Sequence, residues 1–394
     1  MLWGKNYSSI EFEDIERIVE SKVSENRTLD YKKEINLVKD KNRKELLFDI
    51  ASFTNSEGGV IIYGIEEEKD NNQNNTGIPA KISGIETANI DKLILAIDDL
   101  VKTSIEPNIP NIIISPLEKD YKKVLFIGIP KSHGIPRMVT YKSSNKFYKR
   151  RNSGKYLVDV YELNQMFMEN IEVVEKIESF RKNRLNIMRD KSFNLNIDSK
   201  NITLLHITPM SYFQYNRLDL TGDKSIQYLT KKLRPIGGAQ GWNKRLNFEG
   251  LLVFELAGEN DKIGAYNQVF RNGIIEFFTH RFHGQDNDFF LGMLETHIIN
   301  RVKQTIQVYE YFEIPPPFVV QLSITNLLNR YINIMDVHNI QYIPFLADDL
   351  LIPNIVINDF SEDISKQLKS LFDIIWQSAG IKESPFYNKN GIRQ

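Results

Sequence analysis

Residues 43–65 limit most strongly what this chain can fold into. Apolar residues recur in the first part of the segment at spacings of three and four, the period of an amphipathic helix; they include Leu46, Leu47, Ile50, Ala51 and Phe53. The run 55–59, Asn-Ser-Glu-Gly-Gly, ends that helix, because glycine takes the positive φ that a tight turn needs. Val60 to Ile65 is a short β-branched run, typical of a buried strand. Three glutamates, 66–68, follow, and on pattern alone they form a solvated acidic loop after a packing unit.

The totals restrict the class of protein. A chain of 394 residues predicts two or three domains. With 50 basic and 51 acidic residues, global charge predicts no partner, so only local patterning can. The absence of cysteine excludes disulfides and thiolate zinc sites. The first residues lack an apolar signal-peptide core, and no stretch reaches about 20 apolar residues, so we expect a soluble, cytoplasmic protein.

The pattern of elements predicts an α+β chain in three parts. Residues 1–170 are expected to form one domain with a mixed sheet and flanking helices, 171–194 a charged helical connector, and 195–394 a second α+β domain. The expected helices are 9–23, 90–105, 158–168, 289–312 and 361–376, with Ser361 as the cap of the last one. The expected strands are 28–37, 111–116, 123–129, 147–150, 202–207, 248–256, 266–278 and 318–322, and residues 71–77 read as a mobile polar loop.

Acidic residues near the first strand form one candidate site. Asp30 and Lys32 lie two apart on a strand and so share a face. Carboxylates that hold Mg²⁺ or Mn²⁺, beside a lysine that contacts a phosphate, are what a metal-dependent phosphodiesterase needs. Glu25 lies five residues before Asp30, so the two converge only if the chain bends at Asn26-Arg27. Taken alone, this pattern also fits an exposed strand face with alternating charges.

A basic stretch from Lys131 to Lys155 is the second candidate. Its 25 residues include no Asp or Glu, and aromatic residues alternate with the cations. The pattern favours phosphate contact with base stacking over a solvated hairpin. The residues expected to bind nucleic acid are Lys131, Arg137, Lys142, Lys146, Tyr148, Lys149, Arg150 and Arg151, and Lys155 completes the eight cations.

Two stretches of the second half carry weaker signals. His280 and His283, with Asp286, Asp288 and His297, offer metal-ligand types, but a polar turn is the commoner interpretation. The glycine-rich run 234–242 lacks the Gly-Lys-Ser or Gly-Lys-Thr of a P-loop and reads as a loop or a partner contact.

In combination, the first half resembles the Schlafen AlbA-type domain. The resemblance rests on Glu25-(x)4-Asp30-Tyr31-Lys32 and on the run from Ala51 to Ile65, and it continues through residues 78–84, 107, 129–132, 136 and 147–150. It covers about residues 12–168. Asp30 stands where the family usually has Glu, and Glu66 where it usually has Asp; each exchange keeps a carboxylate but changes its reach.

The resemblance implies a nucleic-acid-binding fold. By analogy with animal Schlafen nucleases, Glu25, Asp30 and Glu66 would bind Mg²⁺ or Mn²⁺, with Glu67 as an alternative third acid. Lys32 would contact the scissile phosphate of structured RNA such as tRNA, and the role would lie in stress or phage defence. This chain has one copy of a domain that those nucleases contain twice, so a homodimer would rebuild their groove. The alternatives are a non-catalytic DNA- or RNA-binding regulator and, third, an ATP-binding protein.

Overall fold

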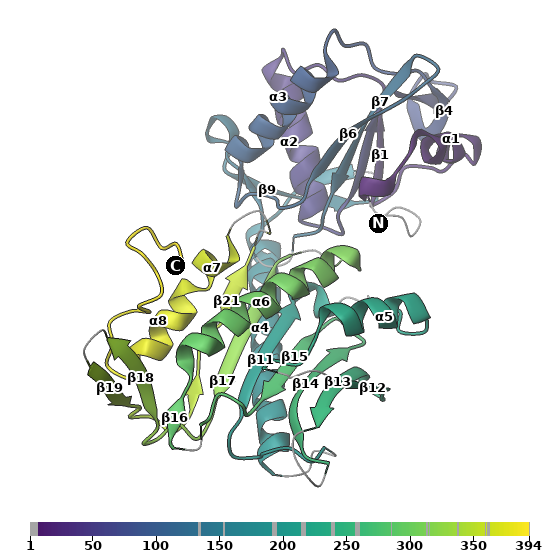
Figure 1. Cartoon of the computed structure of the whole chain (residues 1–394). Coiled ribbons are helices and arrows are strands. Elements are labelled where there is room, and N and C mark those ends of the chain that lie inside the picture. The colour runs from purple at the N-terminus through teal and green to yellow at the C-terminus, as the bar shows by residue number, and fades with distance from the viewer. Residues whose placement is uncertain are drawn as a thin grey trace. The chain divides into compact units, whose positions relative to one another are not determined.

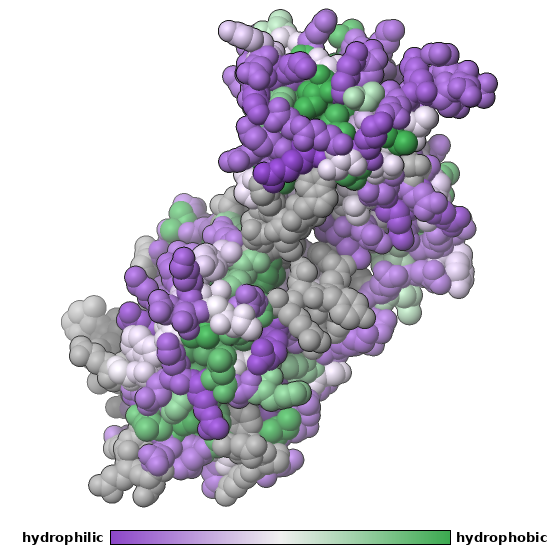
Figure 2. Space-filling model, turned by 90° about the vertical axis from the view of Figure 1, so that its right-hand side faces the viewer, coloured by the Kyte–Doolittle hydropathy of each residue, from purple (hydrophilic) through white to green (hydrophobic). Residues whose placement is uncertain are grey.

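A computed structural model describes residues 7–132, 135–152, 154–190, 195–213, 218–237, 241–256, 261–284, 286–312, 314, 316–336, 339–358, 360 and 363–393. The chain divides into two compact units, residues 1–172 and 173–394. Each unit has a hydrophobic core of its own, as an α+β fold of this length requires. On the face drawn in Figure 2, hydrophilic residues cover most of the surface and hydrophobic residues emerge in small groups.

The first unit opens with a short 3-10 turn and alternates strands with helices (Figure 1). Its helices are α1 (Phe12–Glu20), α2 (Asp40–Thr54), α3 (Ile90–Ser104) and the start of α4 (Val160–Arg189). Its strands are β1 (Leu29–Lys32), β2 (Gly59–Tyr63), β3 (Ile65–Lys69), β4 (Asn75–Ile82), β5 (Ile105–Glu106), β6 (Ile113–Lys119), β7 (Lys122–Ile129), β8 (Met138–Val139), β9 (Lys146–Arg151) and β10 (Gly154–Leu157).

A central sheet with strand order β1-β2-β7-β6 organises this unit. β1 runs parallel to β2, and β7 pairs antiparallel with both β2 and β6. Because side chains alternate along a strand, Leu29 and Tyr31 pack toward α1 while Ile61 and Tyr63 pack toward α2 and α3. Figure 1 shows α1 on one side of the sheet and α2 and α3 on the other. Asp30 and Lys32 therefore face the α2 side.

The helix–turn–strand expectation is confirmed, and the glutamates after it are placed differently. α2 ends at Thr54 and β2 begins at Gly59. Gly64, with φ of +100°, then breaks the strand, so the three glutamates lie on the separate strand β3 and not in a loop. β3 pairs with β4, which already includes residues 75–77 of the expected polar loop. Asp70 accepts hydrogen bonds from the backbone of Asn72 and Asn74, both at 2.8 Å, and so fixes the connecting turn.

Two other elements of the first unit differ from the sequence prediction. The strand expected over 28–37 is only the four residues of β1, since β2 offers it partners for no more than those four. The helix expected at 158–168 and the connector expected at 171–194 are one continuous helix, α4. The boundary between the two units falls within it, at residues 172 and 173.

The second unit is built on a larger antiparallel sheet. Its strands are β11 (Thr203–Pro209), β12 (Asn243–Leu246), β13 (Gly250–Leu256), β14 (Ile263–Phe270), β15 (Ile275–Thr279), β16 (Asp288–Phe289), β17 (Phe318–Ile324), β18 (Tyr331–Asp336), β19 (Asn339–Pro344), β20 (Leu350–Leu351) and β21 (Ile355–Ile357). Its helices are α5 (Asp223–Lys232), α6 (Leu291–Tyr311), α7 (Ile364–Gln367) and α8 (Lys369–Gln377).

The large sheet has the order β12-β13-β14-β15-β11-β17-β20, with β21 also on β17. Leu204 and its neighbours pack against the end of α4, and Leu205 and its neighbours against α6. The single strand expected over 266–278 is two strands, because Gly273 turns the chain at a φ of +92°. Ser361 lies outside the described residues; Asp363 caps α7 by accepting from the Ser365 amide at 2.7 Å. No described helix has the length and apolar character needed to cross a bilayer.

Candidate functional site

Asp30 is the centre of a buried charge cluster at the end of β1. Its side chain is only 3% exposed. Lys32 Nζ lies 2.6 Å from Oδ2, and Arg150 Nη2 donates to Oδ1 at 2.7 Å. Burial opposes ionisation, but the charges of Lys32 and Arg150 outweigh it and hold the pKa of Asp30 below its ordinary value. Asp30 is thus an ionised carboxylate with a cation on each oxygen.

Glu25 is held against the same strand by a bend. Asn26 pairs with Leu29 across the turn, and its Oδ1 accepts from the Thr28 amide at 2.9 Å. This bend at Asn26-Arg27 is the one that convergence with Asp30 requires. Glu25 Oε1 accepts from the Tyr31 amide at 2.7 Å. Burial first, and then the negative charge of Asp30, raise the pKa of Glu25 to about 7.

Of the three glutamates on β3, Glu67 is the one beside Glu25. The Gly77 amide donates to Glu67 Oε2 at 2.9 Å, while the Gly77 carbonyl accepts from the Glu25 amide at 2.7 Å. The charge of Glu67 also contributes to the raised pKa of Glu25. One glycine therefore holds both acidic residues.

Glu66, which was expected to complete the acidic set, is engaged elsewhere. Lys33 and Lys81 contact its two oxygens at 3.0 and 3.2 Å, and their hydrogen bonds lower its pKa. The pairing of β3 with β4 shifts its register between Glu66 and Glu67, and the two side chains have different partners. Glu68 pairs with Lys22 at 2.7 Å.

The acidic residues do not make a metal site as they stand. Three carboxylates are a suitable donor set for Mg²⁺ or Mn²⁺. However, both oxygens of Asp30 already have cationic partners. Among the described residues, no group of three or more His, Cys, Asp or Glu side chains is arranged to hold a metal ion.

Asp49 is a residue of this cluster that sequence reasoning missed. It is buried on α2, where Lys155 Nζ contacts its Oδ1 at 2.7 Å. Burial raises its pKa although Lys155 opposes this. A signal was present: Asp49 lies three residues after Leu46 and four before Phe53, on an otherwise apolar helix face. A carboxylate at such a position requires a partner in the fold.

The Asn55-Ser56 turn clamps the basic stretch onto the domain. Asn55 Nδ2 donates to the carbonyls of Arg137 and Tyr148, at 2.7 and 3.1 Å, and Oδ1 accepts from the Arg137 amide at 2.7 Å. Ser56 Oγ accepts from the Arg150 amide at 2.8 Å. The clamp fixes both the loop after β7 and the strand β9.

Four of the eight cations of the stretch are not free for phosphate. Arg137 and Arg150 are buried, which corrects the expectation that they line a binding surface. Lys142 is paired with Asp40, and Lys155 with Asp49. Tyr148 was expected to bind nucleic acid, but its ring already stacks on Phe48, with the two ring centroids 4.2 Å apart.

The other four cations face outward. Lys146 and Arg151 are exposed, and Lys131 and Lys149 are partly exposed. Arg151 lies over the Tyr156 ring, 4.9 Å from its centroid. Lys131 and Lys149 line a polar pocket of about 190 Å³ together with Arg27, Asn55, Ser56, Glu57, Ser132, Pro136, Met166 and Glu169. The positive surface is thus smaller than the sequence indicates and is centred on β9 and the clamped loop.

The weaker candidates of the second half have structural roles. His283 Nε2 lies 2.9 Å from the Thr325 carbonyl, and burial lowers the pKa of His283 to about 4. Within the part of the chain that the structure describes, neither His280 nor His283 belongs to a metal-holding group. Of the glycine-rich run, residues 238–240 lie outside the described residues. Arg234 lies over the Trp242 ring at 4.5 Å.

Comparison with known proteins places the first unit. Residues 25–159 match the family model described as Schlafen, AlbA_2. No curated protein matches the chain. A solved structure of the DIP2311 protein from Corynebacterium diphtheriae is similar at 19% identity and a TM-score of 0.27, over 39% of this chain and 27% of that one. The N-terminal domain of a RecG-related protein from Nitrosomonas europaea is similar at 13% identity and a TM-score of 0.25, over 31% and 74%. Residues 25–159 are thus similar to the Schlafen AlbA_2 family, and this family match suggests nucleic-acid binding.

Proposed function

We propose that the first unit binds nucleic acid, RNA in preference to DNA, through Lys131, Lys146, Lys149 and Arg151. The observation that supports this is the clamp: Asn55 and Ser56 hold rigidly the two segments that present these outward cations. A fixed array of cations contacts successive phosphates at lower entropic cost than mobile side chains do. The ion pairs of Arg150 and Lys155 neutralise buried acids, so they support the array without taking part in it.

A salt titration tests this function. Each lost phosphate contact lowers the steepness of log K against log salt by about 0.7 to 0.9. Replacing Lys131, Lys149 and Arg151 together by alanine is expected to flatten the slope by about 2 to 3 units for RNA. The matched control replaces Lys69, Lys92 and Lys122, which are exposed on β3, α3 and β7. Equal slopes for the two triple variants and the wild type would contradict the proposal.

Metal-dependent cleavage of structured RNA, with Mg²⁺ or Mn²⁺, is the second candidate. It is favoured by the raised pKa of Glu25, because a divalent cation would relieve the repulsion from Asp30 and Glu67. Such an ion would have to compete with Lys32 and Arg150 for Asp30. In this interpretation Glu67, and not Glu66, is the third acid.

Incubation of purified protein with tRNA and each metal distinguishes the two functions. If the chain is a nuclease, Glu67→Gln removes cleavage and the neighbouring Glu66→Gln retains it. If tRNA stays intact with both metals while RNA binding is retained, the chain is a non-catalytic nucleic-acid binder. Cleavage that persists in Glu67→Gln would exclude this acidic set as the site.

A further inference from the structure

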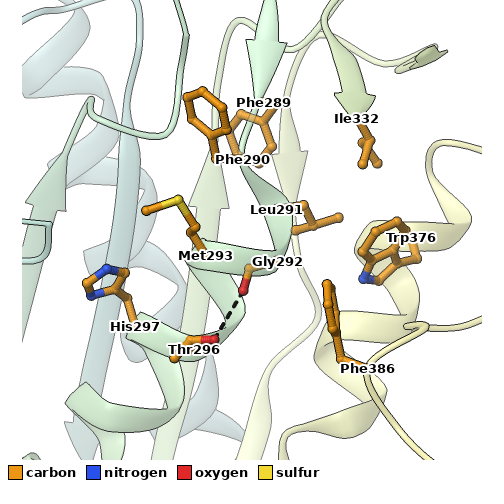
Figure 3. A pocket seen from close by; sticks show the side chains of 10 residues that line it. All are labelled: Phe289, Phe290, Leu291, Gly292, Met293, Thr296, His297, Ile332, Trp376 and Phe386. Atoms are coloured by element: carbon orange, nitrogen blue, oxygen red, sulfur yellow. Dashed lines mark hydrogen bonds between the residues drawn. The ribbon is translucent and has the colours of Figure 1, made fainter. Parts of the chain in front are cut away.

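An apolar cavity of about 540 Å³ opens in the second unit, between α6, β18 and α8 (Figure 3). Its floor is buried and consists of Phe289, Leu291, Ile332 and Trp376. Its rim is exposed and includes Phe290, Met293 and Phe386. Figure 3 shows the Trp376 and Phe386 side chains on one side of the cavity and Met293 on the other.

Among the residues that the structure describes, no lining side chain of this cavity is charged. The nearest carboxylate of its helix, Glu295, is fully buried behind the wall and is satisfied there. Trp376 Nε1 donates to Glu295 Oε1 at 2.6 Å, Ser384 Oγ donates to the same oxygen at 2.9 Å, and Arg393 pairs with Oε2. The indole nitrogen is thereby occupied, so Trp376 offers the cavity only apolar ring surface.

Among the described lining residues, Thr296 and His297 supply the polar groups, and Thr296 is already engaged. Thr296 Oγ1 donates to the Gly292 carbonyl at 3.2 Å and accepts from Arg393 Nη2 at 2.8 Å. His297 is half-buried, and burial lowers its pKa, with the charge of Arg301 adding to the effect. Near pH 7 it is therefore a neutral ring with one donor and one acceptor nitrogen.

We infer that this cavity binds an uncharged small molecule with a flat aromatic body and one hydrogen-bonding group directed at His297. The volume lies in the range of roughly 300 to 1,000 Å³ typical of small-molecule sites. The aromatic walls favour a ring, which stacks or packs edge-on against them. A charged ligand would lose its hydration, and Arg393, the cation beside Thr296, is already paired with Glu295. This site is separate from the nucleic-acid function of the first unit.

A pair of dyes tests the charge requirement on the full chain. 1-N-phenylnaphthylamine is uncharged, and 8-anilino-1-naphthalenesulfonate has the same ring system with a sulfonate. We expect saturable 1:1 binding of the uncharged dye, at least tenfold tighter than binding of the sulfonate, with transfer of Trp376 fluorescence to the dye. Met293→Glu, which places a charge at the exposed rim, is expected to weaken the uncharged dye at least tenfold. Leu246→Glu on β12 is the matched control and is expected to change nothing, since Leu246 is exposed away from the cavity.

A second pair of probes tests the role of His297. His297→Phe keeps a ring in place but removes both nitrogens. We expect it to weaken 1-naphthol severalfold and to leave naphthalene unchanged. Circular dichroism and melting curves of each variant verify that it is folded.

Three results would overturn the inference: no saturable binding of the uncharged dye, equal affinity for the sulfonate, or equal effects of Met293→Glu and Leu246→Glu. A concentration-dependent dimer that Met293→Glu dissociates, with no dye binding to the wild type, would also overturn it. The cavity would then be part of an interface with a second copy of the chain.

Discussion

Arg150 is the cation that completes the buried charge cluster around Asp30. In the sequence it stands in a run of three cations that all read as phosphate ligands. In the structure its side chain is 1% exposed, because it pairs with Asp30, 120 residues earlier in the chain. The identity of the acids could be predicted from spacing and resemblance. Which acid meets which cation could not, since this depends on pairings between distant elements.

Replacing Arg150 by methionine is expected to destabilise the first unit. The change leaves Asp30 buried with only Lys32 as a cationic partner and removes the guanidinium from the Phe53 ring, 4.2 Å away. Breaking a buried ion pair from one side costs about 3 to 5 kcal/mol. Urea unfolding measures the loss in the free energy of unfolding. Arg151→Met, at the exposed neighbouring residue, is the control and is expected to change this free energy by no more than about 0.5 kcal/mol. A loss below about 1 kcal/mol for Arg150→Met would show that the pair is solvated.

The raised pKa of Glu25 predicts how the effect of replacing Glu25 on folding stability depends on pH. The folded state retains the proton up to about pH 7, whereas the unfolded state releases it near the ordinary value of 4.5. Stability is therefore lost as the pH rises between these two values. Glu25→Gln, which imitates the protonated form, is expected to raise the melting temperature relative to wild type more at pH 8 than at pH 5. Thermal melts at both pH values provide the comparison; an equal effect at the two would contradict the assignment.

At the scale of elements, the sequence was most informative where one periodicity decides the outcome. The helical spacing located α3 and α6 to within two residues at each end, and the end of α2 to within one residue. It failed where tertiary contacts set the length, as in the short strand β1, and where one glycine divides a β-branched run, as at Gly64 and Gly273. The acidic strand β3 was missed because its own sequence, Ile-Glu-Glu-Glu-Lys, has no alternation of apolar and polar residues.

Gly58 in the α2–β2 turn provides a test at this scale. It has a φ of +71°, and a Cβ there would lie 2.7 Å from the Lys131 amide nitrogen and 2.8 Å from the Ile129 carbonyl oxygen. Gly58→Ala is expected to cost more than about 1 kcal/mol of folding free energy and to weaken nucleic-acid binding by displacing the loop that contains Lys131. Gly154→Ala, whose Cβ would meet nothing closer than 3.9 Å, is the control. Equal stabilities of the two variants would mean that the turn relaxes freely.

At the scale of the molecule, each unit has its own core and its own buried ionic centre. In the second unit that centre is Glu276, which is fully buried and binds Arg184 through two hydrogen bonds, at 2.7 and 2.8 Å. Tyr266 and His206 complete its partners, both at 2.8 Å. The cluster fixes the C-terminal part of α4 on the large sheet, and it stabilises a unit that does not contain the basic stretch.

Calorimetry of the full chain is expected to resolve two unfolding transitions, one for each core. Arg150→Met should lower the melting temperature of one transition, and Glu276→Gln that of the other, because each removes a partner from a separate buried cluster. A single transition that both substitutions shift equally would show that the two units unfold as one.

The Asn55-Ser56 clamp separates the backbone scaffold of the domain from the side chains that the scaffold presents. Asn55 and Ser56 belong to the most recognisable sequence motif of the domain, and their side chains bind backbone carbonyls and amides. The motif therefore specifies the backbone scaffold and does not specify which side chains that scaffold presents. The glutamates of β3 and the outward lysines of β9 make none of these hydrogen bonds, whereas Asp30 of β1 pairs with Arg150, whose amide Ser56 holds. In protein engineering, Asn55 and Ser56 would therefore be kept constant, and the exposed strand positions would be varied to change what the domain binds.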